Sequence, residues 1–504
     1  MNFLNTLQES FSINATKNAL CINDTFFTYK DLSNCVLKIR KIIQTHINSY
    51  EKLIGLVANN DLETYATIFA LWLEGKAYVP INPLAPKERN SEIFKLTEST
   101  CVFDSTMNSL YSGDFKVFST PSHYKTSKDH ILSHTPYVKY NMAYILFTSG
   151  STGKPKGIPI SFENLNALLS TFDNDSEYTL NSTDKCLQMY DLTFDASLTA
   201  FMPTFLAGAC SYTVPSDSIK YFYIFKLMQK YDLTVLKMVP SIIYYLRPYF
   251  SEINRPNVRY CIFGGGKLFK DVVDEWATCV PNSKIYNHYG PTECTVCSSY
   301  YSYSPSHRDK SHNGILSIGK PLAGIDYIII NNDKQILKNK EEGELCLSGK
   351  QLTKGYWKNE KLNSTLFFNV QLDNGEVKRF YKTGDICFMD NDGYLMYVER
   401  KDFQVKVRGY RVELGEIEYH IKSMITKNNL VVIDINNTSG NNEIALVIEG
   451  NKLDASTTST LFNYLQTKLP NYMVPTQTHF LDQLPYNNNG KLDRNQLRKL
   501  ITKN

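Results

Sequence analysis

The chain has 504 residues, of which 42% are hydrophobic, so it is long enough for more than one domain with a large core. Its net charge of +4 is small and no basic block stands out, which argues against a nucleic-acid partner. The eleven cysteines are scattered along the chain and favour a reducing compartment over a disulfide framework. The sequence shows no signal peptide and no apolar run that could span a bilayer, so we expect a cytoplasmic protein without a membrane partner.

Up to about residue 300, short β-rich runs alternate with amphipathic stretches. Residues 53–57 are predicted to form a strand, and residues 62–73 a helix with its apolar positions mostly on one face. This alternation favours largely parallel sheets covered by helices, in which ligands bind at the carboxyl ends of strands. The loops after Phe147, Phe263 and Tyr286 all follow strand-like runs, which is consistent with a shared cleft.

From about residue 320 to 400 the pattern changes to strands separated by glycine turns. From Phe403 onward a small unit is predicted, with strands at 403–407, 430–433 and 443–448 and helices at 413–425 and 457–468. We place the boundary beside Arg400-Lys401-Asp402, which gives domains of residues 1–401 and 402–504. The expected fold class is α/β with a smaller α+β domain.

The phosphate loop, residues 147–157, has the sequence FTSGSTGKPKG and is the most distinctive stretch of the chain. It places three glycines, four hydroxyl residues and two lysines after a strand-like lead. Glycines let backbone N–H groups come close to a ligand, and hydroxyls and lysines add donors and positive charge. That chemistry suits the phosphates of a nucleotide, although the spacing differs from the Walker pattern.

Four further motifs follow downstream in order. They are Asn287-His288-Tyr289-Gly290-Pro291-Thr292-Glu293, Tyr381-Lys382-Thr383-Gly384-Asp385, residues 400–413 (RKDFQVKVRGYRVE) and Asn489-Gly490-Lys491-Leu492-Asp493-Arg494. Together with the phosphate loop they resemble the ordered core motifs of the ANL superfamily of adenylate-forming enzymes, over nearly the whole chain. The adenylation-domain branch of nonribosomal peptide synthetases fits best, because of the Tyr-Gly-Pro-Thr-Glu form and the run Ala77-Tyr78-Val79-Pro80-Ile81.

The resemblance implies a fold and a reaction. The fold has a large N-terminal domain of mainly parallel sheets layered with helices, a distorted β-barrel part, and a small mobile lid domain that begins at a hinge, Asp402. In the reaction a carboxylic acid attacks the α-phosphate of ATP to give an acyl-adenylate and pyrophosphate. The acyl group then passes to a thiol. No carrier segment follows Arg494, so we expect transfer to the phosphopantetheine thiol of a carrier protein in trans, with coenzyme A as the alternative acceptor.

The resemblance also gives roles to single residues. The first step joins two anions, so a cation is required, and Lys491 would bridge the substrate carboxylate and the nucleotide. Glu293 would hold Mg²⁺ through a hard oxygen ligand. Asp385 would accept hydrogen bonds from both ribose hydroxyls, while Tyr289 would stack on adenine and Asn287 would bind its amino group.

The rest of the expected nucleotide site surrounds these groups. Arg400 would approach the ribose or a phosphate, although Glu399 stands where the family usually has a glycine. The implied nucleotide-binding set is Thr148, Ser149, Gly150, Ser151, Thr152, Gly153, Lys156, Gly265, Asn287, His288, Tyr289, Gly290, Thr292, Asp385, Arg400 and Lys491. The implied catalytic set is Lys491, Glu293, Thr148 and Thr292.

Asp195, in Phe194-Asp195-Ala196-Ser197, resembles the family aspartate that binds the α-ammonium group of an amino acid. Acyl- and aryl-CoA synthetases generally lack this carboxylate, so it favours an amino acid substrate. The structural alternative is an aspartate that caps a helix beginning near Ser197. The amino-acid pocket implied by the family consists of Asp195, Ala196, Thr199, Lys237, Ile262, Gly264, His288, Val296, Cys297 and Lys491.

Lys237 lies in an otherwise apolar run and indicates which amino acid the pocket would take. A buried ammonium without a counter-charge costs several kcal/mol, and an acidic substrate side chain would supply that charge. His288 and Thr199 would add donors and Gly264 would leave room. The set resembles the family pattern for L-aspartate, followed by asparagine. The structural alternative for Lys237 is an ion pair with a protein carboxylate or exposure to solvent.

Three other functions remain open from the sequence. D-Alanine:carrier-protein ligases share a similar stretch from Asp402 to Glu418, but their pocket lacks a lysine and usually has a cysteine where Gly264 stands. An acyl- or aryl-CoA synthetase is disfavoured by Asp195. A binding protein that keeps the fold without catalysis is disfavoured by the presence of Lys491, Glu293 and Asp385.

Overall fold

The computed structural model describes residues 2–120, 141–150, 154–173, 178–304, 310–372, 374–402, 404–425, 428–437, 440–485 and 492–501. The chain forms two compact units. The first contains Met1–Pro83, Phe94–Leu146 and Gly157–Lys401, and the second contains Leu84–Ile93, Phe147–Lys156 and Asp402–Asn504. Within the described ranges, no helix has both the length and the apolar character needed to cross a membrane.

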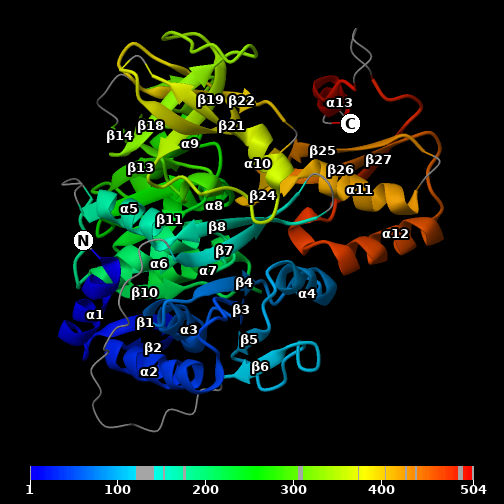
Figure 1. Cartoon of the computed structure of the whole chain (residues 1–504). Coiled ribbons are helices and arrows are strands. Elements are labelled where there is room, and N and C mark those ends of the chain that lie inside the picture. The colour runs from blue at the N-terminus through cyan, green and yellow to red at the C-terminus, as the bar shows by residue number, and fades with distance from the viewer. Residues whose placement is uncertain are drawn as a thin grey trace. The chain divides into compact units, whose positions relative to one another are not determined.

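A nine-stranded sheet is the largest element of the first unit, with the order β17-β14-β13-β12-β11-β9-β10-β1-β2. Figure 1 labels β14, β13, β11, β10, β1 and β2 of this sheet. Its strands are β1 (Asn18–Ile22), β2 (Thr25–Thr28), β9 (Lys185–Gln188), β10 (Cys210–Thr213), β11 (Val235–Met238), β12 (Tyr260–Gly264), β13 (Lys284–Tyr289), β14 (Ser299–Tyr303) and β17 (Lys320–Pro321). The strands from β1 to β13 along this order pair in parallel, and antiparallel strands flank them. Parallel strands covered on both faces need apolar side chains on both, which explains the nearly continuous apolar runs in β11 and β12.

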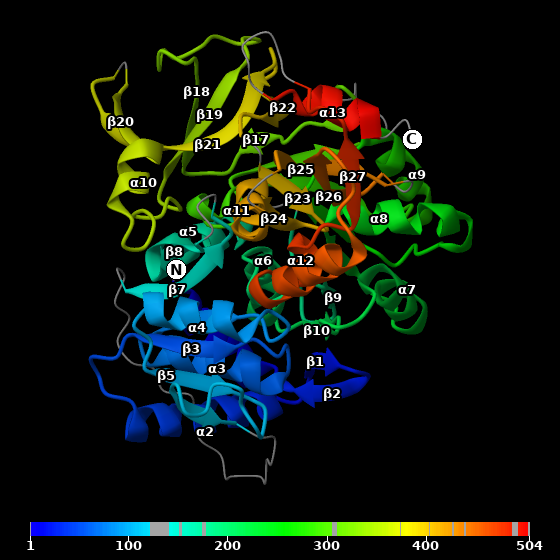
Figure 2. The same ribbon diagram turned by 90° about the vertical axis from the view of Figure 1, so that its right-hand side faces the viewer.

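A second, six-stranded sheet has the order β6-β5-β3-β4-β7-β8, and Figure 2 shows β3, β5 and β7 lying near one another. Its strands are β3 (Leu53–Val57), β4 (Ala77–Ile81), β5 (Cys101–Asp104), β6 (Lys116–Ser119), β7 (Met142–Thr148) and β8 (Lys156–Ser161). Strand β3 has the bounds predicted from the sequence. The pairs β3–β4, β3–β5, β4–β7 and β5–β6 are parallel, which confirms the expected α/β class.

The helix expected at residues 62–73 is α3 (Leu62–Leu73), but it is not amphipathic in the way the sequence suggested. All twelve of its residues are buried, including Glu63. A helix that is apolar all round is a core helix, and α3 accordingly packs on α2 and on strands of the second sheet. The other α-helices that lie wholly or partly in this unit, among the described residues, are α1 (Phe3–Ile13), α2 (Tyr29–His46), α4 (Lys87–Leu96), α5 (Phe162–Asp173), α6 (Ala196–Leu206), α7 (Lys220–Lys230), α8 (Pro240–Leu246), α9 (Lys270–Cys279) and α10 (Glu360–Leu366).

The strand-and-turn region predicted at residues 320–400 forms a third sheet. It consists of β18 (Ile325–Ile330), β19 (Gly343–Gly349), β20 (Phe367–Gln371), β21 (Val377–Met389) and β22 (Leu395–Arg400), all paired antiparallel. Strand β21 is thirteen residues long and its register shifts against both β19 and β22. Register shifts of this kind bend a sheet, which is consistent with the distorted barrel expected for this region.

The second unit has its own core around a three-stranded sheet of β25 (Leu430–Asn436), β26 (Asn442–Glu449) and β27 (Gln477–Leu481). Alternate side chains of β25 point to opposite faces. Leu430 and Val432 pack with α11 (Leu414–Met424) and α12 (Ala455–Lys468), whereas Val431 and Ile433 pack with α13 (Arg494–Ile501). A hairpin of β23 (Gln404–Val407) and β24 (Tyr410–Glu413) leads into α11.

Gly319 is required by the close approach of two strands in the first unit. Its φ is +85°, and a Cβ atom there would lie 1.7 Å from the carbonyl oxygen of Tyr300 in β14. Its own carbonyl accepts a hydrogen bond of 2.9 Å from the backbone of Leu395 in β22. Because backbone atoms cannot move aside cheaply, we expect Gly319→Ala to lower the melting temperature sharply or to abolish soluble expression.

Gly314→Ala is the matched control for this prediction. Gly314 also has a positive φ, +76°, but a Cβ there would meet nothing within 4 Å. This control should therefore show only the left-handed backbone penalty of about 1–2 kcal/mol. Thermal unfolding of both variants, followed by circular dichroism under identical conditions, checks the prediction, and equal losses would contradict it.

Candidate active site

The expected amino-acid pocket lies on one face of three neighbouring parallel strands. Lys237 of β11 pairs with Ile262 of β12, and Gly264 of β12 pairs with His288 of β13. Because side chains alternate along a strand, these four positions share a face of the sheet. A Cβ on Gly264 would lie 3.2 Å from the carbonyl oxygen of His288, so a larger residue here would crowd the backbone of β13.

The ammonium group of Lys237 is buried without a carboxylate ion pair among the described residues. Only 7% of the residue is exposed. Its Nζ donates a hydrogen bond of 3.3 Å to the carbonyl oxygen of Thr199 in α6 and lies 5.9 Å from the ring centre of Phe172 in α5. Burial lowers the pKa of Lys237 to about 8, although the neighbouring acidic groups of Cys297 and Asp195 act in the opposite direction. Lys237 therefore neither forms an ion pair with a described carboxylate nor lies exposed to solvent, which were the two structural alternatives for this residue.

His288 lies beside this lysine among aromatic rings. Its imidazole is nearly parallel to the ring of Phe172, with an interplanar angle of 10° and centroids 6.1 Å apart, and the rings of Tyr286 and Tyr300 flank it. Burial, followed by the positive charge of Lys237, holds the pKa of His288 well below its usual range. The ring is therefore neutral at pH 7, and its Nδ1 makes no hydrogen bond within the described part of the chain.

Asp195 occupies the N-cap position of α6 but does not cap it. Its backbone is helical, with φ −60° and ψ −31°, and its side chain makes no capping hydrogen bond. The residue is 6% exposed, so its carboxylate is buried near the start of the helix. Ala196 and Thr199 follow on the first turn, where the hydroxyl of Thr199 donates to the carbonyl oxygen of Ala196 over 3.0 Å. The capping alternative for Asp195 is therefore wrong.

The remaining pocket positions, Val296 and Cys297, lie in and directly after a strained loop. Thr295 and Val296 have φ values of +50° and +70°, which β-branched residues rarely adopt. A Cβ on Gly290 would lie 2.4 Å from the carbonyl oxygen of Val296, so this loop turns back tightly and position 290 admits only glycine. Cys297 is 2% exposed and burial raises its pKa to about 12, which keeps the thiol protonated and unreactive.

Asn287, Tyr289, Asp385 and Arg400 converge in the first unit at the expected base and ribose site. Tyr289 donates its hydroxyl to Oδ2 of Asp385 over 2.5 Å, and Arg400 donates to Oδ1 over 3.0 Å. The side-chain amide of Asn287 donates to the carbonyl oxygen of Ser317 over 2.9 Å, which leaves the amide oxygen to accept from another group. These contacts orient one carboxylate, one aromatic ring and one amide acceptor.

Glu293 provides the chemistry that a magnesium ion requires. It is fully buried in the short turn Thr292–Cys294, and Tyr356 donates its hydroxyl to Oε1 over 2.6 Å. Mg²⁺ is typically bound by one or two carboxylates together with substrate phosphates. An oriented carboxylate therefore fits this ion. Thr292 is 8% exposed in the same turn, and Gly265, which follows β12, has a positive φ of +78°.

In the second unit the phosphate loop contacts the start of α11. Ser149 donates to the carbonyl oxygen of Arg411 over 3.0 Å and accepts from the backbone N–H of Glu413 over 2.9 Å. Gly150 donates its N–H to the carboxylate of Glu416 over 3.0 Å, and the ammonium of Lys156 lies 3.4 Å from the carboxylate of Glu413. Two donors of the described part of the loop, the N–H of Gly150 and the ammonium of Lys156, therefore face protein carboxylates.

Several expected site residues cannot be placed with these contacts. Ser151, Thr152, Gly153 and Lys491 lie outside the described residues. The hydroxyl of Thr148 is buried without a hydrogen-bond partner among the described residues, so it can still donate to a ligand. Asp402 is exposed and accepts a bond of 3.2 Å from the backbone N–H of Gln404.

Two residues that contact the expected site were not found from the sequence. Phe172 touches both Lys237 and His288, and Tyr356 touches Glu293. An aromatic residue at the end of a helix normally indicates core packing, so Phe172 carried no separate signal. Tyr356 follows Gly355 in a turn and carried none either.

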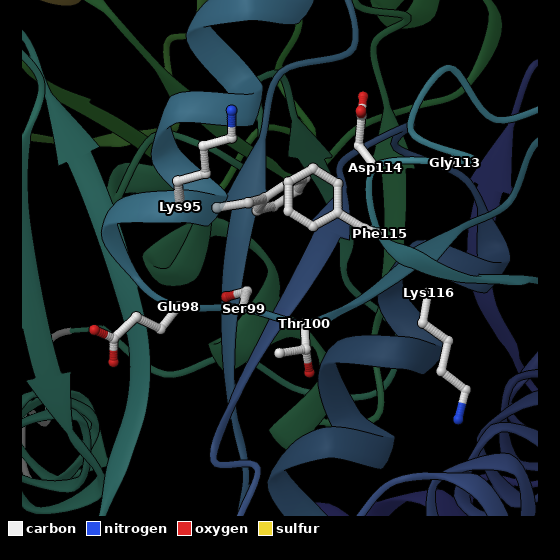
Figure 3. A pocket seen from close by; sticks show the side chains of 9 residues that line it. Lys95, Glu98, Ser99, Thr100, Gly113, Asp114, Phe115 and Lys116 are labelled. Atoms are coloured by element: carbon white, nitrogen blue, oxygen red, sulfur yellow. The ribbon is translucent and has the colours of Figure 1, made fainter.

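A separate hollow of about 430 Å³ contains none of the expected site residues. It is lined by Phe94, Lys95, Glu98, Ser99, Thr100, Gly113, Asp114, Phe115 and Lys116. Figure 3 shows the side chains of Lys95, Glu98, Asp114 and Lys116 pointing away from one another around the ring of Phe115. Charged groups that diverge in this way do not form a binding constellation.

Comparisons with known proteins agree with this geometry. The sequence model described as AMP-binding enzyme matches residues 7–357. The chain is 29% identical over 507 residues to tyrocidine synthase 2 of Brevibacillus parabrevis, and the match covers 98% of this chain. It covers only 14% of that much longer protein.

Two solved structures share the fold. The adenylation domain AlmE of Vibrio cholerae, in complex with glycyl-adenosine-5'-phosphate, matches with a TM-score of 0.86 and 24% identity, covering 100% of this chain and 98% of that one. PA1221, a nonribosomal peptide synthetase protein containing adenylation and PCP domains, matches with a TM-score of 0.84 and 21% identity, covering 98% and 84%.

The buried charge of Lys237 predicts an unusual stability effect. Lowering the pKa from 10.5 to about 8 makes the folded state less able to hold the proton than the unfolded state. This shift lowers the free energy of unfolding by about 3 kcal/mol below pH 8, at about 1.4 kcal/mol per pKa unit. We therefore expect Lys237→Met to raise the melting temperature of the ligand-free protein at pH 7. The gain should shrink between pH 8 and 10.5, where the native lysine loses its proton first.

Lys76→Met is the matched control. Lys76 is also buried, at 5% exposure, but its Nζ donates to the carbonyl oxygens of Asn48 and Glu51 over 2.9 and 2.7 Å. Removing this donor leaves two acceptors unsatisfied, so the control should be destabilised. Melting temperatures of both variants between pH 6.5 and 9.5 check the prediction, and a Lys237→Met variant that is less stable at pH 7 would contradict it.

Proposed function

Because the chain belongs to the AMP-binding enzyme family, we propose that it activates L-aspartate with ATP as an aminoacyl-adenylate and releases pyrophosphate. The aspartyl group then passes to the phosphopantetheine thiol of a carrier protein. The observation that carries the choice of aspartate is the buried ammonium of Lys237, which has no carboxylate ion pair among the described residues.

The proposed recognition uses two charges of opposite sign. Asp195 binds the α-ammonium group of the amino acid, and Lys237 binds the side-chain carboxylate. A substrate carboxylate that contacts Lys237 supplies its missing counter-charge. The resulting ion pair is strongly stabilising because charge pairs are stronger where water is excluded. His288, held neutral by burial and by Lys237, can donate a hydrogen bond to the same carboxylate.

The proposed nucleotide site follows from the contacts in the first unit. The amide oxygen of Asn287 accepts from the adenine amino group, Tyr289 stacks on the base, and Asp385 binds the ribose hydroxyls. Glu293 would hold Mg²⁺, which supplies positive charge to the phosphate oxygens. Arg400 keeps the carboxylate of Asp385 in position through its hydrogen bond.

The proposed chemistry requires only charge and position from the protein. A carboxylate oxygen of the amino acid attacks the α-phosphorus of ATP, and the bond to the bridging oxygen of pyrophosphate breaks. Lys491 offsets the repulsion between the two anions. In the second step the carrier thiol attacks the acyl carbon and AMP leaves, after the small domain has rotated about Asp402.

The proposed partner and compartment rest on separate support. PA1221, which has a similar fold, contains a PCP domain beside its adenylation domain. We therefore propose a carrier protein acting in trans as the acceptor. All eleven cysteines are buried and none forms a disulfide, which suits a reducing compartment such as the cytoplasm.

Amino-acid-dependent exchange of pyrophosphate into ATP tests the proposed function. The assay covers the twenty amino acids, D-alanine, and several fatty and aryl acids. We expect the highest rate with L-aspartate and a much lower rate with asparagine. If the highest rate is found with D-alanine, the proposed reaction stands but the proposed substrate is wrong. If no acid supports exchange, both proposals are wrong.

Lys491→Ala serves as the chemical control in the same assay. Removing one preorganised charge of this kind typically lowers the rate about 10²–10³-fold. Equilibrium binding of an ATP analogue should be affected much less. Unchanged exchange would show that Lys491 does not act in the first step.

Lys237→Met should reduce the use of aspartate selectively. Losing one partner of a buried charge pair costs about 2–5 kcal/mol, so kcat/KM for aspartate should fall about 30-fold or more, while the low activity with asparagine should change little. In the unmodified enzyme, kcat/KM for aspartate should be constant below pH 8 and fall above it, because Lys237 is protonated only below its pKa of about 8. Exchange kinetics with both amino acids from pH 6.5 to 9.5 check this, and equal losses for the two substrates would contradict it.

A further inference from the structure

One aromatic ring contacts both groups that are proposed to bind the substrate side chain. Phe172 is partly buried at the end of α5 and packs against the core of the first unit. Its ring stacks on the imidazole of His288, at 6.1 Å and 10°, and Nζ of Lys237 lies 5.9 Å from its centre. Lys237 comes from β11 and His288 from β13, so a residue from outside the sheet joins them.

The same ring has further aromatic neighbours. Phe172 meets Tyr178 edge to face at 5.8 Å, and Tyr178 in turn meets Tyr260 of β12 at 5.0 Å. Aromatic pairs in these geometries are stabilising beyond the area they bury. The ring of Phe172 is therefore held at a defined height above the sheet face.

The π face of Phe172 is well suited to the ammonium of Lys237. A cation within about 6 Å of a ring centre is attracted by the ring quadrupole, and more strongly where both groups are desolvated. The only hydrogen-bond acceptor for Nζ among the described residues is the carbonyl oxygen of Thr199, so much of the ammonium surface faces the ring and the pocket. Aliphatic side chains of the same volume would exclude water but would not stabilise the charge.

We propose that Phe172 is a specificity-determining residue of the amino-acid pocket, whose ring positions Lys237 and His288 together so that the pocket takes an acidic side chain. The inference rests on the proposed function, because it deepens the account of the substrate site. Phe172 acts through these two residues and is a positioning residue for the charge that they present.

The charged and titratable groups that face Lys237 come from three other elements. They are Asp195 from α6, Cys297 from the loop after Thr295, and His288 from β13. Burial raises the pKa of Cys297 to about 12, so its thiol stays protonated through the range of pH 6.5 to 9.5. The upper limb of the pH profile is the fall of kcat/KM for aspartate above pH 8. A shift of this limb therefore reports on Lys237.

Phe172→Leu tests the proposal, because leucine keeps the apolar bulk and removes the ring. We expect KM for aspartate to rise about fivefold, with kcat and the KM for asparagine changing less than twofold. The pH above which kcat/KM for aspartate falls should shift downward by about half a unit, because the ammonium loses a stabilising contact. Phe172→Tyr, which restores the ring, should recover both values.

A second measurement does not depend on catalysis. In protein labelled only at histidine, the ring protons of His288, assigned by their loss in His288→Gln, should shift downfield in Phe172→Leu as the stacked ring is removed. Phe225→Leu is the matched control, because Phe225 is a half-buried phenylalanine of α7 that packs near Tyr249 and touches neither group. The control should move neither the kinetic values nor these resonances.

The outcomes separate this inference from the proposed function. If the unmodified enzyme prefers aspartate and Phe172→Leu leaves the aspartate-to-asparagine ratio and the pH limb unchanged, the role of Phe172 is overturned while the function stands. Equal loss with both amino acids, not recovered by Phe172→Tyr, would show a merely structural role and also overturn it. If the unmodified enzyme does not use aspartate, the proposed substrate fails, and this specificity role fails with it even where the histidine shift shows the stacking.

Discussion

A lysine ammonium enclosed by the protein without a carboxylate ion pair among the described residues is the constraint around which the candidate site is organised. Burial, only partly offset by Cys297 and Asp195, lowers the pKa of Lys237 to about 8, so the folded chain carries an electrostatic cost at neutral pH. A group of this kind is stable only where the surrounding fold is strong enough to hold it. Here the support is a parallel sheet whose register leaves Lys237, Gly264 and His288 on one face.

The cost at Lys237 and the chemistry proposed for the site have the same origin. The protein gives the buried ammonium little electrostatic stabilisation, so a ligand carboxylate can pair with it. The binding free energy of that ligand then includes removal of the desolvation penalty of Lys237. Burial lowers the pKa of His288, and the charge of Lys237 adds to this effect because it disfavours a second cation beside it. The two side chains therefore present one cation and one neutral donor, a combination that distinguishes a carboxylate from an amide.

Strands, helices and motif positions were predictable from the sequence because they depend on local pattern. Strand β3 and helix α3 have the predicted bounds, and the residues of the nucleotide motif lie on β13 and the turn after it. What could not be predicted depends on partners that are distant in the chain. The apolar stripe of α3 gave no sign that its polar face is also covered, and nothing local showed that Asp195 has a helical backbone and no capping hydrogen bond. Phe172 carries no local signal, because its two contacts come from strands more than sixty residues away.

The phosphate loop shows a related balance of charge in the second unit. The N–H of Gly150 and the ammonium of Lys156 are engaged by Glu416 and Glu413. Carboxylates and phosphates are bound by the same donors. A phosphate that bound to these two donors would first have to displace the carboxylates. The net free energy of binding is therefore the difference between the bonds to phosphate and the bonds to the carboxylates that it replaces. Under the proposed function this arrangement weakens the hold on pyrophosphate, which favours release of the leaving group after the adenylate has formed.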